Sequence, residues 1–413
     1  MKTYKEFVED AIKNYETLPI ESNDIYKKYT VNPAFDYIKT DEKTDKGAHE
    51  AGLEMISKAV TEKTRIKFDG VISNHAANSF NADIKLTSYD KTDIKLLEGK
   101  MFKSNDDKLA AFSNAHANRI IVIDAPENSH KKLNLLFVSN GNLGVQVLVN
   151  SKKNSKIEIF ELFASGGNSK SIVTVLHEIS AGHNSETELN VLHNEGDNAH
   201  VLNLCKAIAK DNAKLNANFI YSGGAVTKTK CYADSDGSGS EVDINEFAFG
   251  TGNQKFDLGT FIANRKPYST ARLESGAILD GNSHCMLKGY AKVEKGAKGC
   301  FSRITERGIL LSDNAHIDAL PDMAIDYSNE VKATHSAATS PIDKEALFYL
   351  ESRGLEEKAA RKAFIISFIT KYISRIKDGV ASEVAMSVML NKLEGGELGT
   401  IPEIKTSGIW MSR

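Results

Sequence analysis

Short runs in which hydrophobic and polar residues alternate fill the middle of the chain, from Ser155 to about Ser340. Turn residues such as Gly and Asn separate these runs at a nearly constant step of roughly 15 residues, which matches one strand plus one turn. Period-two alternation predicts strands with one buried and one solvated face. Clear examples are Ile157-x-Ile159, Leu189-x-Val191, Val242-x-Ile244 and Ala271-x-Leu273.

Two architectures fit about a dozen such units without helices between them: an antiparallel sandwich or barrel, and a parallel β-helix. A βαβ fold does not fit, because it needs a helix after each strand. The constant step favours the parallel β-helix, since every unit must cover the same path around a coil. We therefore predict a mainly β protein with flanking helices, built on a right-handed parallel β-helix.

Helical spacing appears on both sides of this region. Near the N-terminus, Phe7, Ala11 and Tyr15 fall on one helical face, and Pro19 follows. Near the C-terminus, Asp343 is placed to cap a helix that ends at Gly354. The predicted organisation is an N-terminal mixed and helical domain (1–117), a β-helix core (118–340) and a C-terminal helical domain (341–413).

Two further C-terminal helices are predicted. One carries a broad apolar stripe from Phe364 to Ile376, and the other runs from Val380 to Leu393 with Val384 and Val388 inward. The stripe exceeds what a short hairpin can bury, so it packs on the end of the coil or on a partner. Packing within the chain is the simpler expectation.

Composition narrows the function. Of 413 residues, 52 are Lys or Arg and 55 are Asp or Glu, which gives a net charge of −3 and argues against a dedicated nucleic-acid binder. The first residues lack the apolar core of a signal peptide, and no stretch approaches the roughly 18 apolar residues of a membrane span. These features predict a soluble, cytoplasmic protein without a membrane partner.

The residues suited to metal chemistry are scattered. None of the four cysteines forms a CxxC pair. Cys285 and Cys300 lie one repeat step apart, and we interpret them as small core residues rather than ligands. The histidines between His177 and His200 spread over two repeat units, wider than metal-site spacing. No Walker motif is present, so hydrolysis of ATP would belong to a partner.

One segment resembles a known family. Residues 330–339 (EVKATHSAAT) are similar to the "VKcsHGAT" segment of SufD proteins. Residues 347–355 (LFYLESRGL) are similar to their "lFYLxSRGi" signature, and residues 309–325 resemble their "LLLS…P.LeI" stretch. Residues 18–29 echo an N-terminal element more weakly. The strong match covers roughly residues 305 to 355.

The resemblance to the SufB/SufD family implies a non-enzymatic scaffold for iron–sulfur cluster assembly. It implies a complex with a SufB-like subunit and the SufC-like ATPase, with no stably bound cofactor and a transient cluster at a subunit interface. The family's SufD histidine corresponds to His335. The SufB cysteine would fall near Glu306 or Arg307, where this chain has none, and this absence favours the SufD branch.

His335, Glu306 and Glu330 are the candidate cluster ligands. A neutral imidazole binds iron, but a cluster needs about four ligands, so a partner chain or a small molecule must supply the rest. Ser336 replaces the family's usual Gly, and Ala333 stands where Cys is common. Without the resemblance, His335 would be interpreted as an ordinary hydrogen-bonded histidine.

The C-terminal helical region is where the family docks its ATPase. The candidate docking residues are Leu347, Phe348, Tyr349, Arg353, Gly354, Phe368 and Tyr372. Two other functions stay open: a parallel β-helix carbohydrate-active enzyme, and a structural solenoid that binds protein. The sequence also leaves open whether two copies form a homodimer.

Overall fold

The computed structural model describes residues 4–19, 30, 58–73, 77–79, 81, 84–88, 107–139, 141–165 and 170–404. Most of the weakly family-like segment 18–29, including Tyr26 and Tyr29, lies outside these residues. Among the described helices, none has the length and apolar character needed to cross a bilayer.

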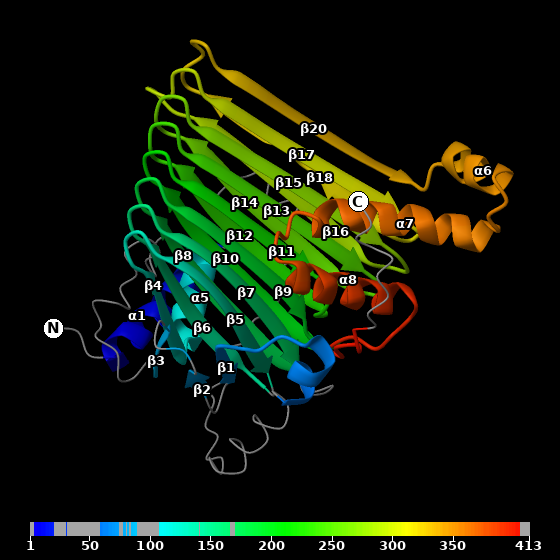
Figure 1. Cartoon of the computed structure of the whole chain (residues 1–413), viewed down its shortest axis with the longest axis horizontal. Helices are drawn as coiled ribbons and strands as arrows, with labels where there is room; N and C mark the ends of the chain where they lie inside the picture. The colour runs from blue at the N-terminus through cyan, green and yellow to red at the C-terminus, as the bar shows by residue number, and fades with distance from the viewer. Residues whose placement is uncertain are drawn as a thin grey trace.

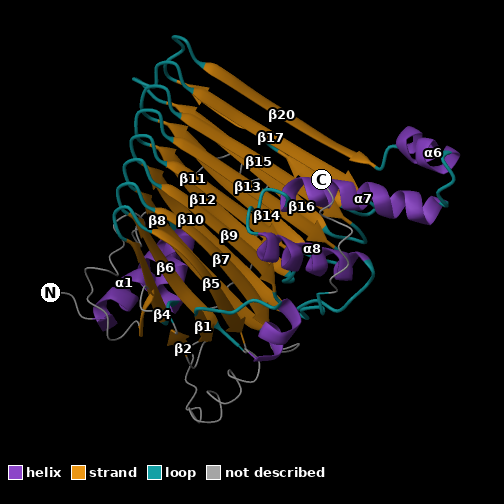
Figure 2. Cartoon of the chain, viewed as in Figure 1, coloured by secondary structure: helices purple, strands orange, loops and turns teal. Residues whose placement is uncertain are grey.

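Two ten-stranded sheets face each other and form a long stack (Figures 1 and 2). One sheet, here called sheet A, has the order β2-β1-β5-β7-β9-β11-β13-β15-β17-β20. The other, sheet B, has the order β18-β16-β14-β12-β10-β8-β6-β4-β3, with β19 also paired to β16. From β4 to β18 the chain alternates between the sheets, and neighbouring strands within each sheet are parallel, apart from β1 with β2 and β3 with β4. The predicted parallel β-helix is confirmed, and the antiparallel sandwich was the wrong alternative.

The strands have the following bounds: β1 Gly70–Ser73, β2 Ala77–Ser79, β3 Ile84–Ser88, β4 Arg119–Ala125, β5 His130–Ser139, β6 Leu143–Ser151, β7 Lys156–Ser165, β8 Ser171–Ala181, β9 Glu186–Asn194, β10 Ala199–Ala209, β11 Lys214–Tyr221, β12 Val226–Ser235, β13 Glu241–Gly250, β14 Lys255–Asn264, β15 Thr270–Leu279, β16 His284–Val293, β17 Phe301–Leu310, β18 His316–Ala319, β19 Asp322–Ile325 and β20 Lys332–Pro341. Strands β1 to β3 come from the segment assigned to the N-terminal domain, and they extend both sheets.

Alternation along each strand builds the core. One coil takes the chain from Ala217 to Ile244 and the next takes it to Leu273, so a coil spans two of the predicted steps. Equivalent residues stack in register, and their side chains form an apolar column inside the coil. Its members in sheet A are almost fully buried: Ile159, Leu189, Ala217, Ile244, Leu273 and Ile304.

The turns stack as well. Asn128, Asn154, Asn184 and Asn212 each adopt a positive φ between 54° and 58°, which asparagine tolerates better than most residues. The Asn184 side-chain amide donates to Asn154 Oδ1, and the Asn154 amide donates to Asn128 Oδ1, both at 2.9 Å. This ladder holds successive coils in the same register, which explains why turn residues recur so evenly in the sequence.

Helices cover both outer faces of the stack. On sheet B, α5 (Lys108–His116) packs Leu109 and Phe112 against Leu176 and Leu202, and α1 (Tyr4–Thr17) lies beside α5. The remaining helices are C-terminal: α6 (Lys344–Ser352), α7 (Glu357–Ile373) and α8 (Gly379–Leu393). Figure 1 shows α7 and α8 lying across the strands, whereas α6 extends past the side of the stack.

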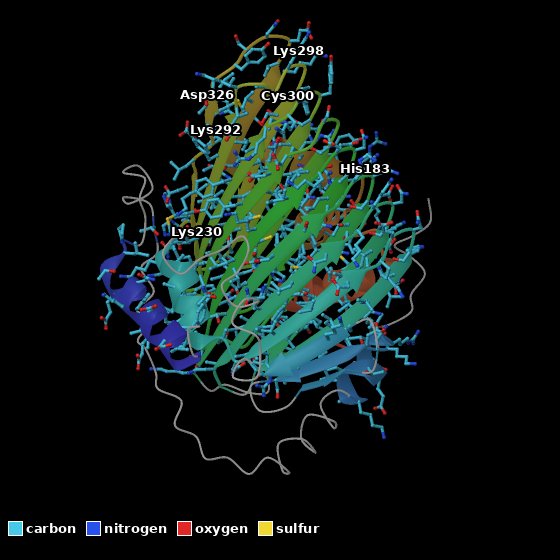
Figure 3. All side chains as sticks on the ribbon, turned by 90° about the vertical axis from the view of Figure 1, so that its left-hand side faces the viewer. His183, Lys230, Lys292, Lys298, Cys300 and Asp326 are labelled. Atoms are coloured by element: carbon cyan, nitrogen blue, oxygen red, sulfur yellow. The ribbon has the colours of Figure 1, made fainter. Side chains whose placement is uncertain are left out.

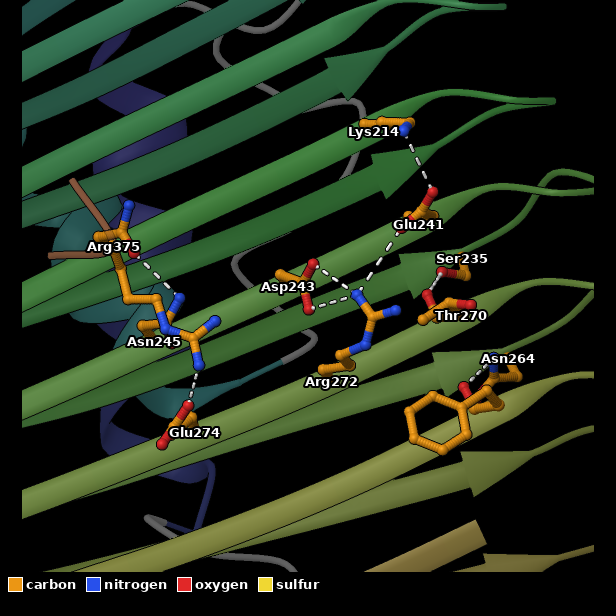
Figure 4. A network of polar contacts seen from close by, with 12 residues as sticks. Lys214, Ser235, Glu241, Asp243, Asn245, Asn264, Thr270, Arg272, Glu274 and Arg375 are labelled. Carbon is orange, nitrogen blue, oxygen red and sulfur yellow. Dashed lines mark hydrogen bonds and ion pairs between the residues drawn. The ribbon is translucent and has the colours of Figure 1, made fainter. Parts of the chain in front are cut away.

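The apolar stripe of α7 packs within the chain, as expected. Ile365, Ile369 and Tyr372 join Phe247 and Ile278 of sheet A in one buried cluster. Ion pairs fix the end of the helix: Arg375 reaches Glu274 on β15 (Figure 4), and Lys371 pairs with the same carboxylate. On the same sheet, Arg272 bonds Asp243 at 2.8 Å and continues a line of alternating charge across neighbouring strands. Helices α7 and α8 are therefore a fixed cover over sheet A.

Candidate functional site

The stack ends in an open strand. β20 is the terminal strand of sheet A and pairs with β17 on one side only. Nine of its ten residues are exposed, and Ala333 is half-buried. No described helix covers this edge as α5 and α7 cover the sheet faces (Figure 1). The candidate site is therefore an uncovered end of the β-helix, formed by β17, β20 and the turn before β20.

His335 lies on the inner side of this end. It pairs with Ile304, whose side chain is buried inside the coil. Residues paired in a parallel sheet point to the same face, so His335 continues the interior column beyond the last closed coil. Ala337 occupies the equivalent place above Glu306. His335 is exposed because no further coil lies over it.

Glu306 lies inside the coil rather than on its surface. Its side chain is fully buried and reaches from β17 to sheet B, where the Gly289 amide donates to Oε1 at 2.7 Å. Burial raises the pKa of Glu306 to about 8, because the ionised form is poorly solvated there. Two coils away in the same column, burial also raises the pKa of Glu246 to about 7. At neutral pH, Glu306 is therefore mainly a neutral acid and a poor anionic ligand.

Glu306→Gln should change the pH dependence of stability. An unfolded glutamate titrates near 4.3, so between about pH 4.3 and 8 the folded chain holds a proton that the unfolded chain has lost. The contribution of this proton to the free energy of unfolding is therefore fully present below this window. It is lost as the pH rises through the window, by up to about 1.4 kcal/mol per pH unit for one group. We expect E306Q to match wild type in urea unfolding at pH 4.5 and to be more stable by a few kcal/mol at pH 8.

Glu330→Gln is the control for this prediction, because Glu330 is exposed. The free energies of unfolding of wild type and E330Q, plotted against pH, should give parallel curves from pH 4.5 to 8. Parallel curves for wild type and E306Q would show that Glu306 does not carry a buried proton.

Glu330 is separated from the other two candidates. It lies in the turn before β20 with a φ of 58°, and its carboxylate is 3.5 Å from Lys298 Nζ. Figure 3 shows Lys298 at the top of the stack. Lys332, which begins β20 just after Glu330, pairs with Phe301 on β17. Glu306 lies five residues beyond Phe301, which is about 16 Å along the strand at the usual rise per residue. The three candidate ligands therefore do not form one cluster.

A polar column inside the coil was not predicted. His177 Nε2 lies 2.9 Å from Glu161 Oε2, and both side chains are fully buried. Cys205 and Cys231 occupy consecutive rungs of the same column in sheet B. The signal was available: these residues stand at inward positions of the alternation, where apolar residues are otherwise the rule.

The cysteines behave as core residues. Cys285 is fully buried in the main interior cluster, and burial raises the pKa of its thiol well above the ordinary value. Cys300 lies in a smaller cluster with Val293 and Ala297 at the turn before β17, near the top of the stack (Figure 3). Cys285 therefore lines the coil interior as interpreted, whereas Cys300 packs in a turn cluster.

The predicted docking residues divide into two groups. Tyr372 is 1% exposed and Phe368 packs against the same buried cluster, so both attach α7 to the sheet. On α6, by contrast, Phe348 is 72% and Tyr349 58% exposed. The Arg353 guanidinium lies 5.3 Å from the centre of the Tyr349 ring.

Two further α6 residues have local roles. Gly354 ends the helix with a φ of 93°, a conformation that glycine adopts most readily. Leu347 is partly buried and lines a groove of about 670 Å³ between α6, α7 and the ends of β17 and β20. The exposed face of α6 beside this groove, formed by Phe348 and Tyr349, is here called the α6 patch.

Comparison with known proteins identifies the family. The family model described as "SUF system FeS cluster assembly, SufBD core domain" matches residues 137–368, more than half of the chain. This region begins within β5, covers the strands from β6 to β20 and continues through α6 into α7. It includes His335, Glu306 and the α6 patch.

Three curated relatives agree with the match. The chain is 25% identical over 189 residues to the iron–sulfur cluster assembly protein SufD of Escherichia coli (strain K12), covering 46% of this chain and 44% of that protein. It is 24% identical over 304 residues to SufD of Bacillus subtilis (strain 168), covering 71% and 68%. It is 23% identical over 362 residues to the chloroplastic SufBD family protein ABCI8 of Arabidopsis thaliana, covering 84% and 63%.

The alignments thus span less than two thirds of the E. coli and Arabidopsis relatives. Within the chain, however, the matched segment contains most of the solenoid, and the histidine segment of β20 lies inside both. The chain belongs to the SufBD family of the SUF iron–sulfur cluster assembly system and is SufD-like.

Proposed function

We propose that this chain is a scaffold subunit for iron–sulfur cluster assembly that has no catalytic activity of its own. It works in a complex with a SufB-like subunit and a SufC-like ATPase, and it holds a transient cluster at a subunit interface. The observation that carries the proposal is the open end of the stack, where β20 is exposed and His335 stands on the inner side.

An exposed terminal strand favours association. The free edge of a strand presents unpaired amide and carbonyl groups that can bond to another strand. Here the strand is ten residues long, and it contains one charged residue, Lys332, at its very start. A SufB-like partner with a similar solenoid end would pair with the free backbone groups of β20 and would cover the residues on its inner side. A second copy of this chain is the other outcome that the test below must distinguish.

His335 is the ligand that this end offers to a cluster. It is exposed, and its place above Ile304 directs it toward the interior face that a partner would cover. Glu306 is buried and Glu330 lies elsewhere on the end, so one imidazole is the contribution proposed for this chain. Since a cluster needs about four ligands, the partner or a small molecule supplies the others. Shared ligation also suits a product that must leave.

The α6 patch is proposed as the contact for the ATPase. Its two exposed aromatic side chains stand beside a groove, the arrangement in which protein interfaces place their strongest anchors. The carbohydrate-enzyme alternative is not supported in the same way. Glu246 and Glu306, whose pKa burial raises to about 7 and about 8, lie inside the coil where a polysaccharide cannot reach them. Burial also raises the pKa of Asp234, but that carboxyl group is paired with Arg265 at 3.1 Å.

His335→Ala is expected to lower cluster formation in the reconstituted three-component complex by about tenfold or more, the scale seen when a metal site loses a supporting group. Folding should be unaffected, because the side chain is exposed. The measurement is cluster absorbance after anaerobic reconstitution, together with co-elution of the three chains. His130→Ala is the control, since His130 is exposed on β5 near the opposite end of the stack.

Two results would contradict this proposal at different levels. Normal cluster yield with H335A would remove His335 from the site but leave the scaffold role intact. Failure of wild-type chain to co-elute with a SufB-like subunit, combined with self-association through β20, would replace the heteromeric scaffold by a homodimer.

A further inference from the structure

Three metal-binding side chains meet on the outer face of sheet B, away from the site described above. His284 begins β16, and its neighbour in register on β18 is His316. Asp318 follows two residues later on β18, so it faces the same side. The intervening Cys285 and Ile317 point into the core. Register alone therefore brings two imidazoles and one carboxylate together on the surface.

The geometry of the three groups is convergent. His284 Nε2 lies 2.8 Å from Asp318 Oδ2, and His316 Nε2 lies 3.1 Å from Asp318 Oδ1. One potential ligand atom from each of the three residues lies within 4.8 Å of the other two. Among the described residues, this is the one such group of three His, Cys, Asp or Glu side chains. An ion placed among these atoms needs only small side-chain movements to reach ligand distances of about 2.0–2.2 Å.

We propose that His284, His316 and Asp318 form a binding site for one divalent first-row transition-metal ion, such as Zn²⁺ or Fe²⁺. Two imidazole nitrogens and one carboxylate oxygen are a donor set that such ions prefer, whereas Ca²⁺ and Mg²⁺ prefer oxygen ligands alone. Binding requires both imidazoles to be neutral with the proton on Nδ1, so that each Nε2 lone pair faces the ion. The ion then replaces the protons that now bridge to Asp318.

The exposure of the group indicates an open site. The His316 side chain is 66% exposed, and those of His284 and Asp318 are 33% and 21% exposed. Three protein ligands leave at least one coordination position for water or an external ligand, which is typical of exchangeable rather than structural sites. Lys255 on β14 is the register neighbour of His284 on the other side, so a positively charged residue stands next to the group in the sheet.

The site is independent of the proposed cluster function. His335 lies on β20 of sheet A at the inner side of the open end, whereas this group lies on the outer face of sheet B. Binding should therefore be measurable on the isolated full-length chain, with no partner subunit. A background variant, His335→Ala, removes binding at the open end and keeps the two proposals separate.

The test is titration of the H335A chain with Co²⁺, followed by its visible absorption, and with Zn²⁺ by calorimetry. His316→Ala and Asp318→Asn should each weaken binding at this site by at least about tenfold. His183→Ala is the matched control, because His183 lies exposed on a turn of the stack (Figure 3). Zn²⁺ should also raise the Tm of the H335A chain and not that of the two site variants, since only a bound folded state is stabilised.

Loss of binding in both site variants with retention in H183A supports the proposal. Unchanged affinity and stoichiometry in either site variant would overturn it, as would an equal loss in H183A. The Tm measurement guards against misfolding, because all four chains should unfold at similar temperatures without metal. If a site variant has a lower Tm without metal, His284→Gln takes its place in the comparison. Weaker metal binding by H284Q then supports the proposal, and unchanged binding overturns it.

Discussion

Ala337→Asp is expected to weaken binding of the SufB-like subunit by at least about 100-fold. Ala337 lies above the buried Glu306 on the inner side of β20, so a partner that completes the stack must cover it. An aspartate there would place an unpaired charge in the interface, beside an interior that already disfavours carboxylates. Burying such a charge costs about 3–5 kcal/mol, and each 1.4 kcal/mol is a factor of ten in affinity.

Ala338→Asp is the matched control for this experiment. It makes the same change one residue later, where the side chain points to the outer face of sheet A, beside the exposed Arg307. Both alanines are exposed in the isolated chain, so both variants should fold with the same Tm. Affinities measured by calorimetry or surface plasmon resonance decide the result: equal binding by A337D and wild type would show that the partner does not cover the open end.

Phe348→Asp should weaken binding of the SufC-like ATPase by about 30-fold. The Phe348 ring is 72% exposed at the start of the α6 patch and contributes little to the chain's own core. Central aromatic anchors of interfaces typically contribute 2 kcal/mol or more, which corresponds to about this change in affinity. The measurement is the dissociation constant of the ATPase for the chain, with the Tm of F348D expected to equal that of wild type.

Val380→Asp tests whether any exposed apolar residue on the C-terminal helices would give the same effect. Val380 is 41% exposed in the first turn of α8, away from the α6 patch. ATPase binding should be unchanged in this variant. An equal loss in V380D and F348D, or no loss in F348D, would place the docking surface elsewhere. Phe368 and Tyr372 are unsuitable for this test, because both hold α7 on the sheet and their replacement would destabilise the chain.

Much of the fold could be predicted because it is encoded locally. The alternation at Ile157-x-Ile159 and Val242-x-Ile244 marks strands, and the stacked asparagine turns explain the constant step. Asp343 caps α6 by accepting a hydrogen bond from the Glu345 amide at 2.9 Å, and Gly354 ends the helix as expected. Such signals depend on a residue and its near neighbours in sequence, so they are readable without knowing the tertiary contacts.

The candidate site could be predicted only in part. His335 was singled out by its family-like segment and lies at an uncovered end of the stack, and its role as a cluster ligand stays a prediction. Glu306, near the position of the SufB cysteine, and Glu330 were predicted as further ligands, but their positions in the coil separate them from each other. Glu306 points inward at a fully buried position, whereas Glu330 lies in a turn beside Lys298. Tyr372, grouped with Phe348 for docking, faces the sheet instead.

By itself, the sequence determined the repeating strands, the flanking helices and the histidine segment, because periodicity, capping and short motifs act over a few residues. Only the tertiary structure decided which distant residues meet. Lys228 and Lys288 converge on Asp257 across three strands, and His284 meets His316 and Asp318, because parallel register aligns positions about thirty residues apart. Burial decided the rest: Glu330 lies exposed in a turn beside Lys298, whereas burial inside the coil keeps Glu306 mainly protonated at neutral pH.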